Sequence, residues 1–354
     1  MDQYFKSYEE LDVHRLMLND TTRTLAYKEA IFNCADKFED KVVLDVGAGT
    51  GILSIFCAQA GAKKVYAVEA SELAKIAEEV VIENNLERVI KVIHSRVEDL
   101  DPNEIGKVDI IVSEWMGFYL VHEGMLESVL FARDRFLNEE GILFPSTAIL
   151  YASPCQLPSM FQFWNDVCGV NMKCIGEHYR KTKSAKPEIA LVNQDDLLAD
   201  KKVIAWLDLH CVSLEEINTL GNEEYVSVCN KEGTIQGICI WFSVIFPDSS
   251  ELSTGPQDKP THWKQTIIVL PVDVKIEVDE PVAFNLKLKR NSSKERNYNI
   301  ELTLLDATEV EHEIPCYCHM PKCLVTSTYL EQLDQKEKHL EDHNTFCIQD
   351  DHGK

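Results

Sequence analysis

The feature that most constrains this chain is an alternation of short β-branched runs with longer helical stretches between residues 42 and 144. The runs VVLDV, VYAVE, VIKVIH and VDIIV are separated by segments whose apolar residues recur at helical spacing. Strands that alternate with helices pair in parallel, so this region predicts βαβ units and a doubly wound α/β sheet. Segments 51–62 and 71–85 are expected to be the crossover helices.

A different pattern follows Pro145. Apolar residues alternate with polar ones at 284–289 and 298–305, and such period-two runs between turn residues predict an antiparallel sheet or barrel. Segment 161–188 fits neither half, because it carries several aromatic residues outside a regular pattern. It is either an interaction arm or a pair of helices packed on the core.

Charge and cysteine content limit the partners and the compartment. The 354 residues include 35 Lys and Arg against 59 Asp and Glu, and the net charge of -24 would repel phosphate backbones. Cationic partners are therefore favoured over nucleic acid, although such a charge also serves solubility. The 12 cysteines are scattered, which indicates reduced thiols in the cytoplasm or nucleus. Neither a signal peptide nor a membrane-spanning run is expected.

A glycine-rich turn follows the first predicted strand. Gly47, Gly49 and Gly51 let the backbone approach a bound nucleoside closely, but Ile52 replaces the glycine that a dinucleotide fingerprint requires. Glu69 ends the next strand, where a carboxylate can accept both ribose hydroxyls or merely begin a surface helix. Asp45 could orient the turn, meet a ligand ammonium or cap backbone amides.

Two glutamates flank an apolar and aromatic stretch after the fourth strand. Glu114 and Glu123, nine positions apart, would repel each other in a dry pocket unless a delocalised cation lay between them. A guanidinium is planar, always charged and offers five donors, so it suits both carboxylates. The alternative is a pair of surface acids on a loop.

These residues belong to an ordered set of motifs. YFKSY (4–8), HRLMLNDTTRT (14–24), LDVGAGTGIL (44–53), the two glutamates and THW (261–263) together resemble the protein arginine N-methyltransferases, from about residue 4 to 315. The resemblance implies a Rossmann-like domain that binds S-adenosylmethionine, followed by a β-barrel domain. Gly124 departs from the family pattern, in which serine is usual.

The resemblance also implies roles for individual residues. Glu114 and Glu123 would grip the substrate guanidinium, and His262 with Asp20 would relay the proton that is lost. Arg23 would pair with the cofactor carboxylate, Glu69 would hold the ribose and Glu98 would accept from the adenine amine. The implied cofactor-binding residues are Tyr8, His14, Met17, Arg23, Asp45, Gly47, Gly49, Glu69, Glu98 and Met125. The implied substrate-binding residues are Tyr4, Tyr8, Glu114, Met116, Glu123, His262 and Trp263.

Further expectations concern organisation, product and partners. The implied parts are lid helices at 1–40, the cofactor domain at 41–145, the barrel domain at 146–320 with a dimerisation arm near 160–186, and an acidic, flexible or loosely docked tail at 321–354. Met17 and the THW loop resemble the class that yields asymmetric dimethylarginine. Histone tails or arginine- and glycine-rich proteins are the expected substrates, and a homodimer is expected. A methyltransferase for non-protein substrates and a catalytically silent cofactor-binding scaffold are the alternatives.

A metal site is not expected. Cys316, Cys318, His319 and Cys323 could offer thiolates and an imidazole to zinc. Their spacing is not that of a zinc knuckle, no second knuckle lies nearby, and the resembled family needs no metal.

Overall fold

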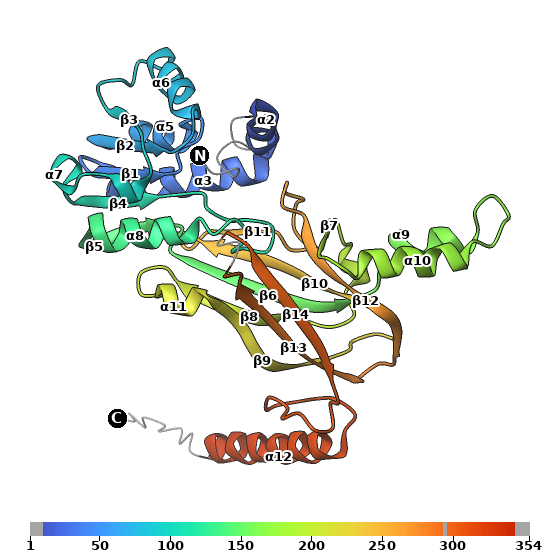
Figure 1. The fold of residues 1–354 in the computed structure, drawn as a ribbon. Coiled ribbons are helices and arrows are strands. Elements are labelled where there is room, and N and C mark those ends of the chain that lie inside the picture. The colour runs from blue at the N-terminus through green and yellow to red at the C-terminus, as the bar shows by residue number, and fades with distance from the viewer. Residues whose placement is uncertain (1–9, 293–295, 344–354) are drawn as a thin grey trace, which may run out of the picture.

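The computed structural model describes residues 10–292 and 296–343. Tyr4 and Tyr8 lie outside the described residues. Figure 1 shows a parallel sheet with its helices, antiparallel sheets beside it, an arm that projects to one side, and a C-terminal helix at the far end. Within the described ranges, no helix is both long enough and apolar enough to cross a membrane.

The first half forms the predicted parallel sheet, with strand order β3-β2-β1-β4-β5. Its strands are β1 (Val42–Val46), β2 (Lys64–Glu69), β3 (Ile90–His94), β4 (Val108–Val112) and β5 (Leu137–Phe144). The connecting helices are α5 (Ile52–Gln59), α6 (Leu73–Glu83), η1 (Val97–Asp99), α7 (Pro102–Ile105) and α8 (Leu126–Phe136). Strand order reverses beside β1, so β1 and β4 diverge at the edge where ligands bind in such sheets.

Three helices precede the sheet. They are α2 (Leu11–Asn19), α3 (Thr21–Asn33) and α4 (Ala35–Phe38). Asp20 lies between the first two and caps α3, because its side chain accepts a hydrogen bond from the backbone N–H of Arg23 at 3.0 Å. Tyr27 and Phe38 are buried, so α3 and α4 are part of the core.

The second half is antiparallel, as the alternating pattern predicts. One sheet has the order β7-β12-β10-β6-β8 with β11 on β10, and the other has the order β14-β13-β9. The strands of the first are β6 (Thr147–Cys155), β7 (Glu188–Ala190), β8 (Lys202–Asp208), β10 (Gly233–Ile245), β11 (Glu251–Ser253) and β12 (Gln265–Ile276). The second contains β9 (Thr219–Val228), β13 (Pro281–Arg290) and β14 (Tyr298–Leu305). Two short helices lie between strands, η3 (Gln194–Asp196) and α11 (Leu214–Ile217).

The arm consists of α9 (Pro158–Phe161), η2 (Gln162–Asn165) and α10 (Lys173–Lys183). It extends away from the rest of the molecule (Figure 1). None of the residues in these three helices is fully buried. Of the two alternatives drawn from the sequence, the structure therefore has the projecting arm, with Met160 and Phe161 at its base packed against a buried cluster of the antiparallel half.

One hydrophobic core joins the two halves. It runs from buried residues of the parallel sheet, such as Val43 and Ile110, to residues of both antiparallel sheets, such as Phe242 and Phe284. Arg133 of α8 adds a polar link, because its Nη1 donates to the carbonyl oxygens of Leu209 and Val212. The halves therefore form one continuous packed body around the site.

The C-terminal segment, for which the polar composition suggested a flexible or loosely docked tail, forms a helix over its described residues. Helix α12 covers Pro321–His343. Pro321 suits the first position of a helix, and the leucines, glutamines, glutamates and lysines that follow have high helix propensity. Its apolar residues Leu324, Val325 and Tyr329 are exposed.

Candidate active site

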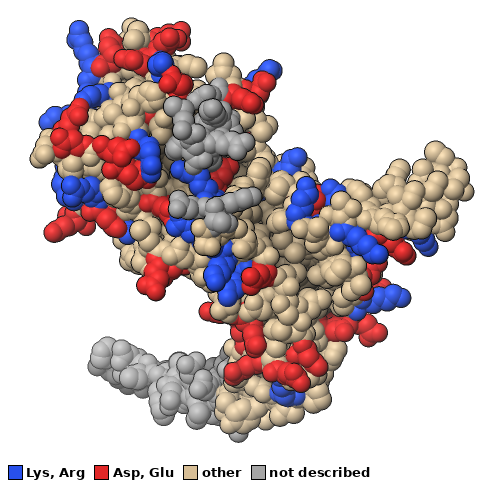
Figure 2. All heavy atoms as spheres, in the orientation of Figure 1, with Lys and Arg blue, Asp and Glu red and all other residues tan. Residues whose placement is uncertain are grey.

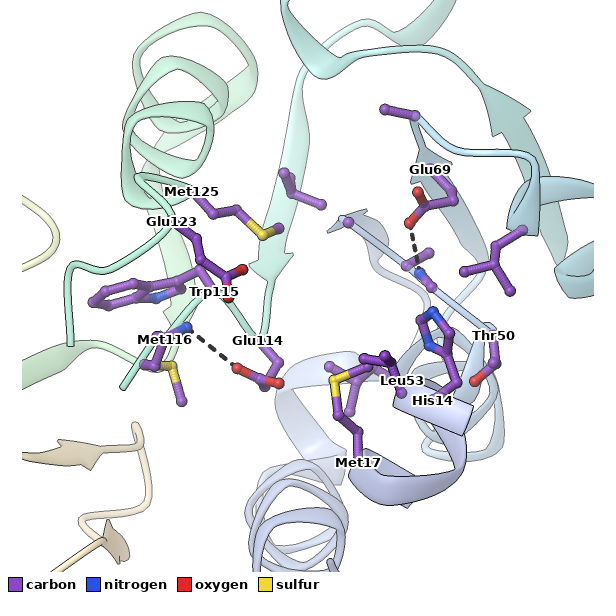
Figure 3. Close-up of a pocket in the computed structure, with 18 of the residues that line it drawn as sticks. His14, Met17, Thr50, Leu53, Glu69, Glu114, Trp115, Met116, Glu123 and Met125 are labelled. Carbon is purple, nitrogen blue, oxygen red and sulfur yellow. Dashed lines mark hydrogen bonds between the residues drawn. The ribbon is translucent and has the colours of Figure 1, made fainter. Parts of the chain in front are cut away.

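A cavity of about 520 Å³ lies at the carboxyl ends of the parallel strands. Its walls come from α2, the glycine turn after β1, the end of β2, the loop between β4 and α8, and the loop before β12. This size and this position at the sheet edge are typical of sites for small ligands. Figure 3 shows Glu69 and His14 on one side of the cavity, and Glu114 and Glu123 on the other.

The glycine turn and Glu69 form one wall. Gly47 has a φ of 72° and Gly49 a φ of 53°, values that L-residues with side chains rarely adopt. The Glu69 carboxylate accepts from the backbone N–H of Gly49 at 2.8 Å and from Ser71 Oγ at 2.7 Å. These bonds fix the carboxylate at the mouth of the turn, where it can still accept hydroxyl groups.

Five other predicted cofactor residues also line the cavity: His14, Met17, Arg23, Glu98 and Met125. Glu98 is held by Ser128, whose Oγ donates to it at 2.6 Å. At Gly47 a side chain would collide with Met125, because a Cβ there would lie 2.2 Å from its Cε. The structure thus brings polar groups for a nucleoside and thioether groups together in one cavity.

Asp45 does not line the cavity. It is fully buried, and Ser54 Oγ donates to its Oδ2 at 2.6 Å. Burial raises the pKa of Asp45 to about 7, and the bond from Ser54 only partly opposes this. Asp45 is therefore not placed to contact a ligand ammonium, which was one of the roles considered from the sequence.

The loop between β4 and α8 presents the two glutamates. Gly117 and Leu120 exchange backbone hydrogen bonds of 2.9 Å and close a tight turn between them. Glu123 has a φ of 75°, an uncommon conformation for a residue with a side chain, followed by Gly124 at 64°. Both carboxylates line the cavity (Figure 3). The strained backbone of this turn therefore orients Glu123 toward the cavity.

Glu114 is already paired with a cation of the chain. Its Oε2 accepts from Arg23 Nη2 at 2.6 Å and from Nε at 2.8 Å, while its Oε1 accepts from the N–H of Met116 at 3.2 Å. Burial alone would lower the pKa of Arg23, but Glu114 raises it above its usual value. Arg23, which the resemblance assigns to the cofactor, is therefore in direct contact with Glu114, which it assigns to the substrate.

Asp20 and His262 meet across the two halves, 242 positions apart in sequence. His262 Nδ1 lies 2.7 Å from Asp20 Oδ2, and the backbone N–H of His262 donates to the same oxygen at 2.8 Å. Burial alone would raise the pKa of Asp20, but the bonds from His262 and Arg23 lower it. A charged Asp20 keeps the proton of His262 on Nδ1, so Nε2 can act as a base.

Trp263 and Met116 complete this wall. Trp263 Nε1 donates to the carbonyl oxygen of Met116 at 2.9 Å, and the rings of His262 and Trp263 lie 4.1 Å apart. Asp20 is not a lining residue, so its contact with the cavity is made through His262.

Some lining residues were not predicted from the sequence. They include Thr50, Ser128 and Arg296. Arg296 Nη1 donates to the carbonyl oxygen of Glu123 at 3.1 Å. Thr50 lies within the glycine motif, so the motif itself could have predicted it. Ser128 and Arg296 belong to no such motif, and only the fold brings them to the cavity.

Three features together are typical of a methyltransferase fold: the doubly wound sheet, the glycine turn without the dinucleotide fingerprint, and the carboxylate at the end of β2. Two family models match the chain. Residues 146–306 match the arginine methyltransferase oligomerization subdomain, and residues 21–129 match the ribosomal protein L11 methyltransferase family.

Relatives give a finer assignment. The chain is 40% identical over 319 residues to protein arginine N-methyltransferase 6 of Danio rerio, covering 87% of this chain and 90% of the relative. It is 38% identical over 331 residues to the probable protein arginine N-methyltransferase 6.1 of Oryza sativa subsp. indica, covering 84% and 86%. Among solved structures, the Trypanosoma brucei PRMT1 enzyme-prozyme complex with AdoHcy matches with a TM-score of 0.75 and 32% identity, covering 86% of this chain and 97% of that chain. A crystal structure of PRMT6 with SAH matches with a TM-score of 0.74 and 31% identity, covering 84% and 100%.

The chain belongs to the protein arginine N-methyltransferase family. It transfers methyl groups from S-adenosylmethionine to arginine side chains of proteins and leaves S-adenosylhomocysteine. The wall of Gly47, Gly49, Glu69 and Glu98 fits this cofactor, since both glycines have a positive φ that residues with side chains rarely adopt and the carboxylates can accept hydroxyl and amino groups.

We expect Asp45 to make stability depend on pH. An unfolded aspartate titrates near pH ~3.9, whereas folded Asp45 has a pKa of about 7, so the folded state holds the extra proton between these values. Its contribution is therefore complete at low pH and is lost as pH rises through 7. Wild type should lose about 2 kcal/mol of unfolding free energy between about pH 5.5 and pH 8, at ~1.36 kcal/mol per unit.

Denaturant unfolding of wild type and Asp45→Asn at the two pH values measures this loss. The neutral variant should lack it, while the exposed-site control Asp12→Asn should retain it. A difference between wild type and Asp45→Asn that is the same at both pH values would contradict the assignment.

Proposed function

We propose that this enzyme forms monomethylarginine and asymmetric dimethylarginine on basic protein segments such as histone tails, and that it works as a homodimer. The observation that carries the proposal is a single cavity in which Glu114, Glu123 and His262 face the wall that fits the cofactor. The net charge of -24 favours basic substrates over acidic ones.

Positioning and electrostatics supply most of the chemistry. When bound, S-adenosylmethionine provides an electrophilic methyl group. A guanidinium is a weak nucleophile, so Glu114 and Glu123 orient it and draw its positive charge away from the attacking nitrogen. His262 Nε2 then receives the proton released by the methylated nitrogen, and Asp20 stabilises the resulting imidazolium.

The class of product is inferred from the residues beside the acceptor. Met17 lines the cavity near Glu114 (Figure 3). A flexible thioether leaves room for a methylated nitrogen to turn back toward the cofactor. This favours a second methyl group on the same nitrogen.

The product proposal predicts asymmetric dimethylarginine at long reaction times. An arginine- and glycine-rich peptide and a histone tail peptide are incubated with enzyme and S-adenosylmethionine, hydrolysed, and analysed by chromatography against standards. Symmetric dimethylarginine, or monomethylarginine alone after exhaustive reaction, would contradict the proposal. Methylation of small molecules without any peptide product would favour the non-protein alternative.

The two glutamates should respond differently to substitution. Glu123→Gln keeps the shape and removes a charged hydrogen bond of roughly 1.5 to 3 kcal/mol, so turnover should fall at least about tenfold with little change in cofactor affinity. Glu114→Gln should lower both, because it also leaves the buried Arg23 without its countercharge.

Methyl transfer and calorimetric cofactor binding are measured in parallel on both variants. Glu83→Gln, at an exposed position of α6, is the matched control and should behave as wild type. Near-native turnover in Glu123→Gln would mean that this carboxylate does not hold the substrate.

The arm supports the proposal of a dimer. Phe163, Val170 and Ile175 are exposed, and the end of the arm carries few charged atoms on the face seen in Figure 2. Exposed apolar patches of this kind mark contact surfaces. The arm also falls within the residues that match an oligomerization subdomain. A closed two-fold dimer would bury both arms at once.

Phe163→Asp combined with Ile175→Asp should convert the protein to a monomer in sedimentation velocity at micromolar concentration, because charges would have to be buried in the interface. Ile82→Asp, at another exposed apolar position, should leave the assembly unchanged. A wild-type monomer with full activity would contradict the dimer.

A further inference from the structure

The loop that follows β14 brings one imidazole and three thiols together. His312 Nδ1 lies 3.4 Å from Cys316 Sγ, 3.4 Å from Cys318 Sγ and 3.2 Å from Cys323 Sγ. The four atoms all lie within 4.8 Å of one another. His319, which the sequence had suggested as the imidazole, is exposed and does not belong to the group.

A hydrogen bond fixes the tautomer of His312. Its Nε2 lies 2.9 Å from the carbonyl oxygen of Ala307, which can only accept, so Nε2 carries the proton. The lone pair of Nδ1 therefore points at the three sulfurs. Metal-bound histidines are oriented in this way by a partner on their other ring nitrogen.

Hydrogen bonding satisfies only part of this arrangement, because once one S–H group donates to Nδ1 the other two thiols are left with weak contacts to neighbouring sulfurs. Nδ1 offers a single lone pair, and three S–H groups cannot all donate to it. Deprotonated thiols would repel one another unless a cation lay between them. A cation at the centre would satisfy all four donors at once.

We propose that His312, Cys316, Cys318 and Cys323 bind one structural zinc ion. Zinc favours tetrahedral sites of three sulfurs and one nitrogen, and its bond lengths place such ligand atoms roughly 3.5 to 3.8 Å apart. The distances from Nδ1 to the three sulfurs, 3.2 to 3.4 Å, are already close to these values, and none of the four atoms is more than 4.8 Å from another. Four protein ligands leave no open position, so the site is structural rather than catalytic.

The ion would fix the start of α12. Cys323 lies in the first turn of this helix, and His312 follows Val310, which packs on Val226 of β9 and Ala283 of β13. Cys318, which lies between His312 and Cys323 in the sequence, is fully buried. The site would therefore clamp α12 to the end of the second antiparallel sheet, where Figure 1 shows it. No described residue of the active-site cavity belongs to the cluster.

Metal analysis of the full-length enzyme tests the proposal. The tag is removed, the protein is dialysed under reducing conditions without chelator, and zinc is measured by inductively coupled plasma mass spectrometry. Wild type should contain about one zinc ion per chain. Cys318→Ser and Cys323→Ser should each lose it, as should His312→Gln. His319→Gln and the exposed Cys211→Ser are matched controls that should retain it.

A second measurement does not depend on whether the variants fold. Wild type stripped of metal and loaded with Co²⁺ should show the thiolate charge-transfer and visible bands of a tetrahedral sulfur-rich site, and its melting temperature should rise on metal addition. Methyl transfer is measured on the same samples and should persist in the stripped enzyme. Wild type without bound zinc, zinc retained in Cys318→Ser, zinc lost in His319→Gln, or octahedral cobalt spectra would each overturn the site.

Discussion

The buried ion pair between Arg23 and Glu114 is the interaction on which the rest of the site depends. Neither side chain is more than one-tenth exposed, so each charge needs the other. Arg23 belongs to α3 and Glu114 to the loop after β4, so the pair attaches the N-terminal helices to the edge of the parallel sheet. Tyr27 strengthens this attachment, because its hydroxyl donates to the carbonyl oxygen of Ser113 at 3.0 Å.

The antiparallel half completes what the ion pair begins. Trp263 donates to Met116, Thr266 donates to the carbonyl oxygen of Phe118, and His262 meets Asp20. The loop that carries both glutamates is thus held on one side by α3 and on the other by β12 and the residues before it. This explains how Glu123 can keep an unfavourable backbone conformation, since strained residues persist only where their surroundings determine them.

The sequence predicted the parts of the site that local chemistry determines. The glycine turn and the two glutamates follow strands and Glu69 ends one, and parallel strands bring their carboxyl ends to one edge. The contact of Arg23 with Glu114 was not predicted, because it joins residues 91 positions apart and each had a separate role in the motif set. Asp45 was predicted to line the cofactor site, but it does not. An acidic residue beside a ligand-binding turn gives no sign in the sequence that its side chain faces inward, toward Ser54. His312 was missed for a similar reason, because its distance in sequence from the cysteines follows no ligand pattern and only the path of the loop makes it a neighbour.

The two glutamates are therefore not equivalent, although the sequence presents them as a pair. A carboxylate has about four acceptor positions, and Arg23 with the backbone N–H of Met116 takes three of those on Glu114. Glu114 is consequently fixed in place and its charge is largely compensated before any substrate arrives. Arg23 can offer a cofactor carboxylate only the donors that Glu114 leaves. A cofactor carboxylate bound to those donors would alter how strongly Glu114 attracts a guanidinium, because both ligands would then share one buried cation.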